Sequence, residues 1–249
     1  SVVGATHNEL LFESLFRFHR YFLVGDRGEY LVACLAGLLI VLAISGVVMW
    51  WPRKWHLAWR VRRDANRLAF NFDLHRAAGS LIAPFLLVNA ITGLVLIFSD
   101  ASTALVDRLF SAQAVAGPSL SPRTGPDNHA SLDYLVRRAN AAFPDGVVTQ
   151  VMVYGADRPV VVRKRTSAES NPLGGTRVFM DPRTGDVVAV VPRTQLTPGV
   201  RMYEWLYPLH TGLLLGMPHR LLLVAAGAGT LLMLVSGLLV WQARRRLRR

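Results

Sequence analysis

Three long apolar segments constrain this chain more than any other feature of its sequence. They run from Tyr30 to Trp51, from Ala77 to Ser99 and from Leu221 to Ala243, and none contains a charged residue. Each is long enough to cross the hydrocarbon core of a bilayer, which takes about 20 residues. Only a helix or a closed barrel satisfies its backbone hydrogen bonds in lipid. The sequence therefore predicts an α-helical membrane protein with three spanning helices.

Basic residues gather beside these spans and predict how they cross. The segment 52–76 carries seven lysine and arginine residues against Asp64 and Asp73, and arginines fill the tail after Ala243. Because basic loops are retained in the cytoplasm, we expect both stretches there and the loop from Asp100 to about Val200 outside. The chain has a net charge of +12. Cytoplasmic retention of the basic loops and their contact with membrane lipids explain this charge, so we expect no nucleic-acid partner.

The N-terminal region is then expected on the outer side, because the first span runs inward. The stretch from His7 to Leu23 mixes leucine and phenylalanine with charged residues, which is typical of an amphipathic helix on a membrane surface. An external N-terminus needs a preceding span or signal. We therefore expect a further spanning helix before Ser1, and four spans in the intact protein.

The region between the second and third spans has the pattern of a small α+β domain. Ser131 to Pro144 places apolar residues at helical spacing. Short runs rich in β-branched residues follow and predict an antiparallel sheet with one helix packed on it: Val147 to Tyr154, Pro159 to Lys164, Thr176 to Met180 and Asp186 to Val191. The segment 181–186 is expected to be a plain turn between two strands.

The predicted organisation thus has four parts. Residues 1–29 form an external amphipathic lead-in, and residues 30–99 form two spans joined by the basic cytoplasmic loop 52–76. Residues 100–200 form the external α+β domain, and residues 201–249 form the third span and its basic tail.

Histidines near the helix entrances are the candidate functional residues. His19 precedes the first span, His75 opens the second, and His210 and His219 precede the third. An ionisable side chain at membrane depth is costly unless it is paired or binds a ligand, and neutral imidazole is a good axial ligand for haem iron. We expect a haem on the outer side between His19 and His210, with His219 as the alternative to His210. His75 is the candidate ligand on the inner side.

Other interpretations of the polar residues are plainer. A zinc site would need three or four clustered ligands, and the sequence has no HExxH or comparable set. His7, His56 and His129 stand in polar surroundings, and we expect them at the surface. Several basic residues of the external domain could attract an anionic ligand, although a solvated face is the plainer interpretation: Arg123, Arg158, Arg163, Lys164 and Arg165.

Short motifs in all three spans resemble the PepSY-associated transmembrane family of bacterial inner-membrane proteins, whose best understood members are ferric-siderophore reductases of the FoxB type. The matching stretches are His19-Arg20, Ser45-Gly46 with Trp50-Trp51-Pro52-Arg53, Asp73-Leu74-His75-Arg76 with Gly79, Thr92-Gly93, Leu209-His210-Thr211-Gly212, and Ser236-Gly237-Leu238-Leu239-Val240-Trp241. The external domain looks like the PepSY-type module of that family.

The resemblance implies a four-helix unit with two haem b groups and a periplasmic PepSY-like domain. The inner haem would pair His75 with a histidine on the absent N-terminal helix, and the outer haem would pair His19 with His210. The implied activity is that of an inner-membrane oxidoreductase. Electrons from an unidentified donor would reduce a periplasmic ferric siderophore, and ferrous iron would be released because it binds hard oxygen ligands weakly.

Two other functions are compatible with the same sequence. In one, the external PepSY-type module binds or regulates a protease, a peptide or an envelope component. In the other, the protein is a haem electron carrier with a different terminal acceptor. The absorption spectrum of the purified protein separates the haem functions from the regulatory one.

Overall fold

A computed structural model describes residues 7–52, 54–64, 66–112, 118, 120, 130–155, 157–169 and 171–248. The chain forms two compact units. Unit 1 comprises Ser1–Ile97 and Met217–Arg249, and unit 2 comprises Phe98–Gly216.

Unit 1 contains the three long helices that the apolar segments predict. They are α2 (Arg27–Trp50), α3 (Arg67–Ile97) and α7 (Met217–Leu247), and each is long and apolar enough to cross a membrane. Most large apolar side chains of α2 and α7 are exposed, among them Leu42, Val48, Val224 and Leu231. Such a surface would be unfavourable in water but is suited to lipid. The three predicted spans are confirmed.

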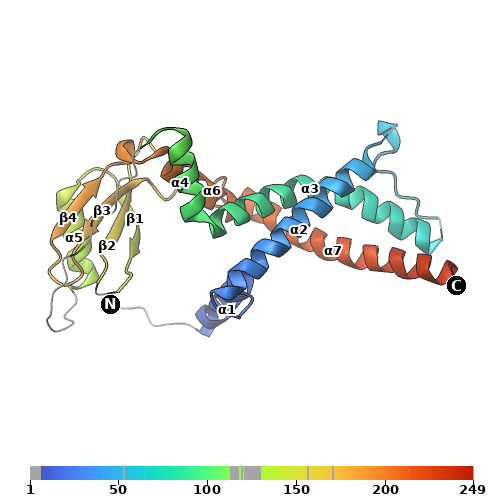
Figure 1. Cartoon of the computed structure of the whole chain (residues 1–249), viewed down its shortest axis with the longest axis horizontal. Helices are drawn as coiled ribbons and strands as arrows, with labels where there is room; N and C mark the ends of the chain where they lie inside the picture. The colour runs from blue at the N-terminus through green and yellow to red at the C-terminus, as the bar shows by residue number, and fades with distance from the viewer. Residues whose placement is uncertain are drawn as a thin grey trace. The chain divides into compact units, whose positions relative to one another are not determined.

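The helix α3 packs against both α2 and α7, and α3 and α7 lie side by side in Figure 1. A Cβ atom on Gly79 of α3 would lie 2.7 Å from the Met233 side chain, and one on Gly229 of α7 would lie 2.2 Å from Ile82. In these contacts a higher residue number on α3 is paired with a lower residue number on α7, so the two helices are antiparallel. Small residues allow this close packing, which lipid itself does not drive.

The predicted N-terminal amphipathic helix is present as α1 (His7–Tyr21). Its apolar side chains remain exposed, as expected for a helix that lies on a membrane surface. The side chain of Arg20 donates a hydrogen bond of 2.8 Å to Glu29 of α2. The turn between these helices needs Gly28, because a Cβ there would overlap the backbone of Tyr21.

Unit 2 is built on a four-stranded antiparallel sheet in the order β1-β2-β3-β4. The strands are β1 (Val147–Met152), β2 (Val160–Arg165), β3 (Thr176–Met180) and β4 (Val187–Val191). The helix α5 (Leu132–Ala142) packs on one face, where Leu135 and Ala139 meet a core of Val160, Val162, Val178 and Met180. This predicted α+β arrangement is confirmed. Within the turn from β3 to β4, the Gly185 amide donates to the Asp181 carbonyl.

Unit 2 also contains two helices that we did not expect, α4 (Ser99–Leu109) and α6 (Pro198–His210). They meet at the N-terminus of α6. The carboxylate of Asp107 on α4 accepts hydrogen bonds from the Thr197 hydroxyl at 2.8 Å and from the Gly199 amide at 2.7 Å. A carboxylate at this place satisfies a free amide and complements the helix dipole. Two short 3-10 helices, Trp55–Leu57 and Arg193–Gln195, complete the described elements.

The helix α6 is joined to the other face of the sheet by an ion cluster. Glu204 of α6 is buried and accepts from Arg163 of β2 at 3.1 Å and from Arg177 of β3 at 3.2 Å. Arg163 also donates to the Gly174 carbonyl at 2.6 Å. Burial raises the pKa of the Glu204 carboxyl, and the charges of the two guanidiniums act in the opposite direction. Burial also lowers the pKa of the Arg163 guanidinium.

The interpretation of Arg163 and Lys164 as part of a solvated basic face is wrong. Both are buried, on opposite faces of β2, because α5 covers one face of the sheet and α6 is joined to the other. The Lys164 amine donates to the Asn140 side chain at 2.7 Å and to the Phe143 carbonyl. Burial lowers the pKa of this amine. Arg158 and Arg165 are exposed, and Arg123 lies outside the described residues.

The contact between α3 and α7 predicts different outcomes for two neighbouring glycines. Gly229→Ala forces a methyl group into Ile82, whereas a Cβ at Gly227 has nothing within 4 Å. We expect the Gly229→Ala protein to be less stable than the Gly227→Ala protein by about 1–3 kcal/mol, measured by reversible unfolding in mixed detergent micelles. Equal stability of the two variants would contradict the described packing.

The ion cluster predicts that Glu204 is essential to unit 2. Glu204→Ala leaves the buried guanidinium of Arg163 without its carboxylate, and breaking such a pair costs about 3–5 kcal/mol. Amide-exchange protection in β2 and β3 should then fall by about two to four orders of magnitude. The matched control is Glu13→Ala, since Glu13 forms an exposed pair with Arg17 and should change little. Unchanged protection in the Glu204→Ala protein would show that the cluster does not hold α6.

Candidate functional site

His75 lies on the face of α3 that packs against α7 and is held there by hydrogen bonds. Its Nδ1 atom is 3.1 Å from the Met233 carbonyl oxygen and 3.1 Å from the Ser236 hydroxyl. The Ser236 hydroxyl is in turn 2.7 Å from the Leu232 carbonyl, to which it donates. The imidazole is therefore fixed by two partners on the neighbouring helix.

These partners favour one tautomer of His75. A carbonyl oxygen only accepts hydrogen bonds, and the Ser236 hydroxyl is already placed to donate to Leu232, so a proton on Nδ1 satisfies both contacts. In the neutral ring the lone pair is then on Nε2. A ring whose Nδ1–H is bound to a backbone carbonyl and whose Nε2 is free has the arrangement that orients histidine ligands of metals.

Gly237 provides the space that this orientation requires. A Cβ atom on Gly237 would lie 3.1 Å from Cε1 and 3.4 Å from Nδ1 of the His75 ring. A larger residue would push the ring away from Met233 and Ser236. The Ser236-Gly237 pair thus has a physical role in seating His75.

His219 is the second histidine with an unusual environment. It lies in the first turn of α7 and is only 8% exposed. Its Nδ1 atom is buried and has no hydrogen-bond partner within the described part of the chain. An unpaired buried polar atom costs about 1–3 kcal/mol, so this nitrogen is in a position where a ligand would offset a penalty.

The other two candidate histidines end helices. His19 is exposed in the last turn of α1, and His210 is half-buried at the end of α6. His19, His75 and His219 belong to unit 1, whereas His210 belongs to unit 2. His210 is the last residue of α6. Glu204 of the same helix is paired with Arg163 and Arg177 of the sheet, so the ion cluster connects the helix that carries His210 to the sheet of unit 2.

Of the remaining histidines, the structure describes the exposure of His56 alone. His56 is exposed on the 3-10 helix, His7 begins α1, and His129 lies outside the described residues. Among the residues that the structure describes, no three His, Cys, Asp or Glu side chains come together as a metal-binding group. A haem needs no such group, because its iron takes only one or two axial ligands from the protein.

Sequence reasoning identified His75 but not the residues that hold it. Met233 and Ser236 are separated from His75 by most of the chain, and only the antiparallel contact of α3 with α7 brings them together. The sequence does contain the Ser236-Gly237 motif, but the motif by itself does not indicate that its partner is His75.

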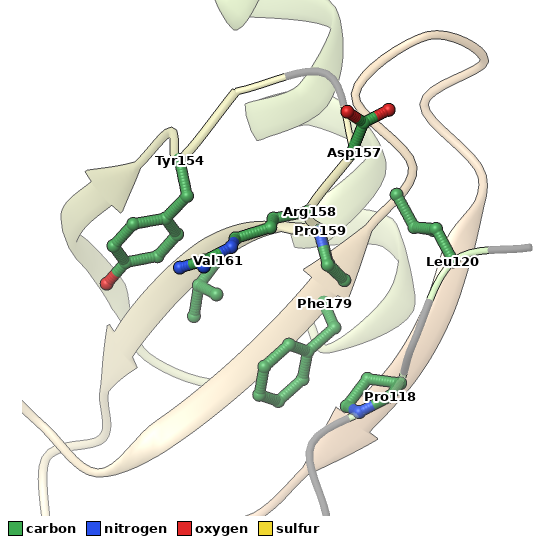
Figure 2. Close-up of a pocket in the computed structure, with 8 residues that line it drawn as sticks. All are labelled: Pro118, Leu120, Tyr154, Asp157, Arg158, Pro159, Val161 and Phe179. Atoms are coloured by element: carbon green, nitrogen blue, oxygen red, sulfur yellow. The ribbon is translucent and has the colours of Figure 1, made fainter. Parts of the chain in front are cut away.

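Unit 2 offers a separate pocket of about 400 Å³ on the sheet face opposite α5. Figure 2 shows the Arg158 side chain extending toward the Tyr154 ring, with Phe179 below it and Asp157 pointing away. The guanidinium of Arg158 and the two rings could bind an anion with a flat apolar part. The pocket is lined by Pro118, Leu120, Tyr154, Asp157, Arg158, Pro159, Val161 and Phe179.

Comparison with known proteins identifies the family. The family model described as the PepSY-associated TM region matches residues 1–244, which is nearly the whole chain. A search of curated proteins found no match. The matched region includes the three spanning helices and the four-stranded sheet described above. The chain is therefore a membrane protein and belongs to the PepSY-associated transmembrane family.

Proposed function

We propose that this protein is a haem b oxidoreductase of the bacterial inner membrane that reduces ferric siderophores in the periplasm. The observation that carries the proposal is the geometry of His75. Its Nδ1 atom is 3.1 Å from the Met233 carbonyl oxygen, which favours the tautomer whose Nε2 lone pair can coordinate a metal. A histidine that is fixed in this tautomer on a membrane-spanning helix suits an axial ligand of haem.

The residues around His75 fit such a group. Gly237 leaves the ring its space, and Ser236 keeps it from rotating. Haem b, when bound, supplies one-electron chemistry at a potential that the axial ligands and the surroundings set. The apolar side chains of α3 and α7 would keep water away from it.

His219 is a stronger candidate than His210 for the outer haem ligand that would pair with His19. Its buried Nδ1 atom lacks a partner among the described residues, and a ligand would satisfy it. His210 stays a candidate because it is half-buried at the end of α6. His19 would be the ligand from α1, beside the exposed apolar face that is suited to the membrane surface.

The direction of the helices supports an inner-membrane topology. Because α3 and α7 are antiparallel, the basic loop before α3 and the arginines after Ala243 lie at the same end of unit 1. By the positive-inside rule that end is cytoplasmic. Unit 2 follows Ile97 and precedes Met217, so it connects to the opposite ends of α3 and α7, which supports a periplasmic location for it.

The pocket beside Arg158 is the place in unit 2 where an anionic chelate would bind. Its volume of about 400 Å³ lies in the usual range for small ligands. Addition of one electron from an upstream donor converts the ferric ion of the chelate to ferrous iron. Ferrous iron binds hard oxygen ligands less strongly, so the carrier releases it.

The proposed role of His219 predicts a specific loss. The His219→Ala protein should contain one haem fewer per chain than the wild type, as counted from the absorption of the extracted pigment. The control is His56→Ala, because His56 is exposed on the loop between α2 and α3 and should not alter the haem content. If His210→Ala loses the haem while His219→Ala retains it, the outer ligand is His210 instead.

The proposed role of Arg158 predicts a change in substrate binding. Arg158→Gln should raise KM for an anionic ferric chelate by about three- to tenfold with little change in kcat, because one charge-assisted contact is lost. Reoxidation of the dithionite-reduced protein by the chelate measures both constants. The matched control is Arg165→Gln, an exposed arginine at the end of β2. Equal effects of the two substitutions would exclude the pocket as the binding place.

A further inference from the structure

A cluster of indole rings lies where α2 ends and the loop to α3 begins. It contains four of the six tryptophans of the chain, Trp50 at the end of α2 and Trp51, Trp55 and Trp59 in the loop. Ring centroids are 5.6 Å apart for Trp51 and Trp55, and 5.8 Å apart for Trp50 with each of Trp55 and Trp59. The Trp50 indole also donates to the Ala58 carbonyl at 3.3 Å. Even so, Trp51, Trp55 and Trp59 are between 47% and 66% exposed.

This loop folds back along one face of α3 and is bound to it at successive levels. The Trp59 indole donates to the Ser80 hydroxyl at 3.0 Å. The Arg76 guanidinium donates to the Arg60 carbonyl at 3.1 Å. Beyond it, the Arg62 guanidinium donates two hydrogen bonds to Asp73, at 2.7 and 3.2 Å.

The positions of these three contacts along α3 correspond to the apolar boundary and the headgroup layer of a membrane. Asp73, Arg76 and Ser80 are spaced three and four residues apart, so they share one face of α3. From Ser80 to Asp73 the helix rises about 10 Å, which is enough to pass through the headgroup layer of one leaflet, about 5–8 Å thick. The charge-free part of α3 begins at Ala77. The indoles are therefore at the apolar boundary, where tryptophan is favoured, and the guanidiniums are further out.

At the level of Arg62 and Asp73 the loop has an open surface hollow of about 500 Å³, lined by residues 60–64. Arg62 is neutralised by Asp73, but the exposed guanidiniums of Arg60 and Arg63 form no ion pair within the described part of the loop or elsewhere in the described residues. Asp64 is the one carboxylate in the lining. Two unpaired guanidiniums beside a concave surface are suited to a phosphate group.

We propose that Arg60 and Arg63, with the exposed indoles of Trp51, Trp55 and Trp59, form a binding site for the headgroup of an anionic phospholipid. Arg60 and Arg63 pair with the lipid phosphate, and the exposed indoles contact the upper part of its acyl chains. Charge complementarity argues for an anionic lipid over a zwitterionic one. The site is independent of the haem histidines, because none of its contacts involves His75 or His219.

The tryptophans themselves report the identity of the nearby lipid. The full-length protein is placed in nanodiscs of phosphatidylcholine that contain 10% phosphatidylglycerol, with bromine on the chains of one lipid or the other. Brominated phosphatidylglycerol should quench tryptophan fluorescence several-fold more than its share of the lipid would give. Arg60→Gln with Arg63→Gln should remove this enrichment, since each guanidinium contributes roughly a fivefold preference.

Two further variants make the outcome decisive. Arg246→Gln with Arg248→Gln removes the same charge from exposed residues at the same end of unit 1 and should leave the enrichment intact. Arg60→Lys with Arg63→Lys keeps the charge and should retain most of it. The loop should stay ordered in all of them, because Arg60 is anchored through its carbonyl and not its side chain. Quenching in proportion to lipid composition in the wild type, or equal losses in both glutamine variants, would overturn the proposal.

Discussion

The antiparallel contact between α3 and α7 is the interaction on which the rest of unit 1 depends. Lipid gives apolar helices no reason to associate, so close packing of small residues must do it. Gly79, Gly229 and Gly237 each allow a side chain of the opposite helix to approach closely. The same contact sets the register that brings Met233 and Ser236 to His75. Packing of the helices and orientation of the candidate ligand therefore have one physical cause.

The register also explains why the two ends of unit 1 differ in chemistry. At one end, the basic loop binds to Asp73, Arg76 and Ser80 of α3, and the arginines that follow α7 lie at the same end. At the other end, the chain enters and leaves unit 2. A protein that carries electrons across a membrane needs such polarity, because the donor and the acceptor are on opposite sides. The arrangement of charge and the proposed reaction are thus consistent.

Much of the fold could be predicted because lipid and sheet geometry impose strong local patterns. The spans follow from their charge-free length, and the strands follow from β-branched runs between turns. The helix α6 has no comparable signal, since Pro208 lies inside it and its buried face depends on Glu204. Arg163 and Lys164 are expected at the surface from the sequence, and only the cover on both faces of the sheet explains why they are buried. His75 was identifiable from its place in a span, but its tautomer depends on partners from the far end of the chain.

We propose that this membrane protein holds haem through His75. The most direct test is the absorption spectrum of the protein purified from membranes supplied with haem, with the pigment counted per chain. The account predicts a Soret band with the sharp reduced bands of low-spin haem b. It also predicts the loss of one haem per chain in the His75→Ala protein. A wild-type preparation without a Soret band, or a His75→Ala protein with the full haem content, would contradict it.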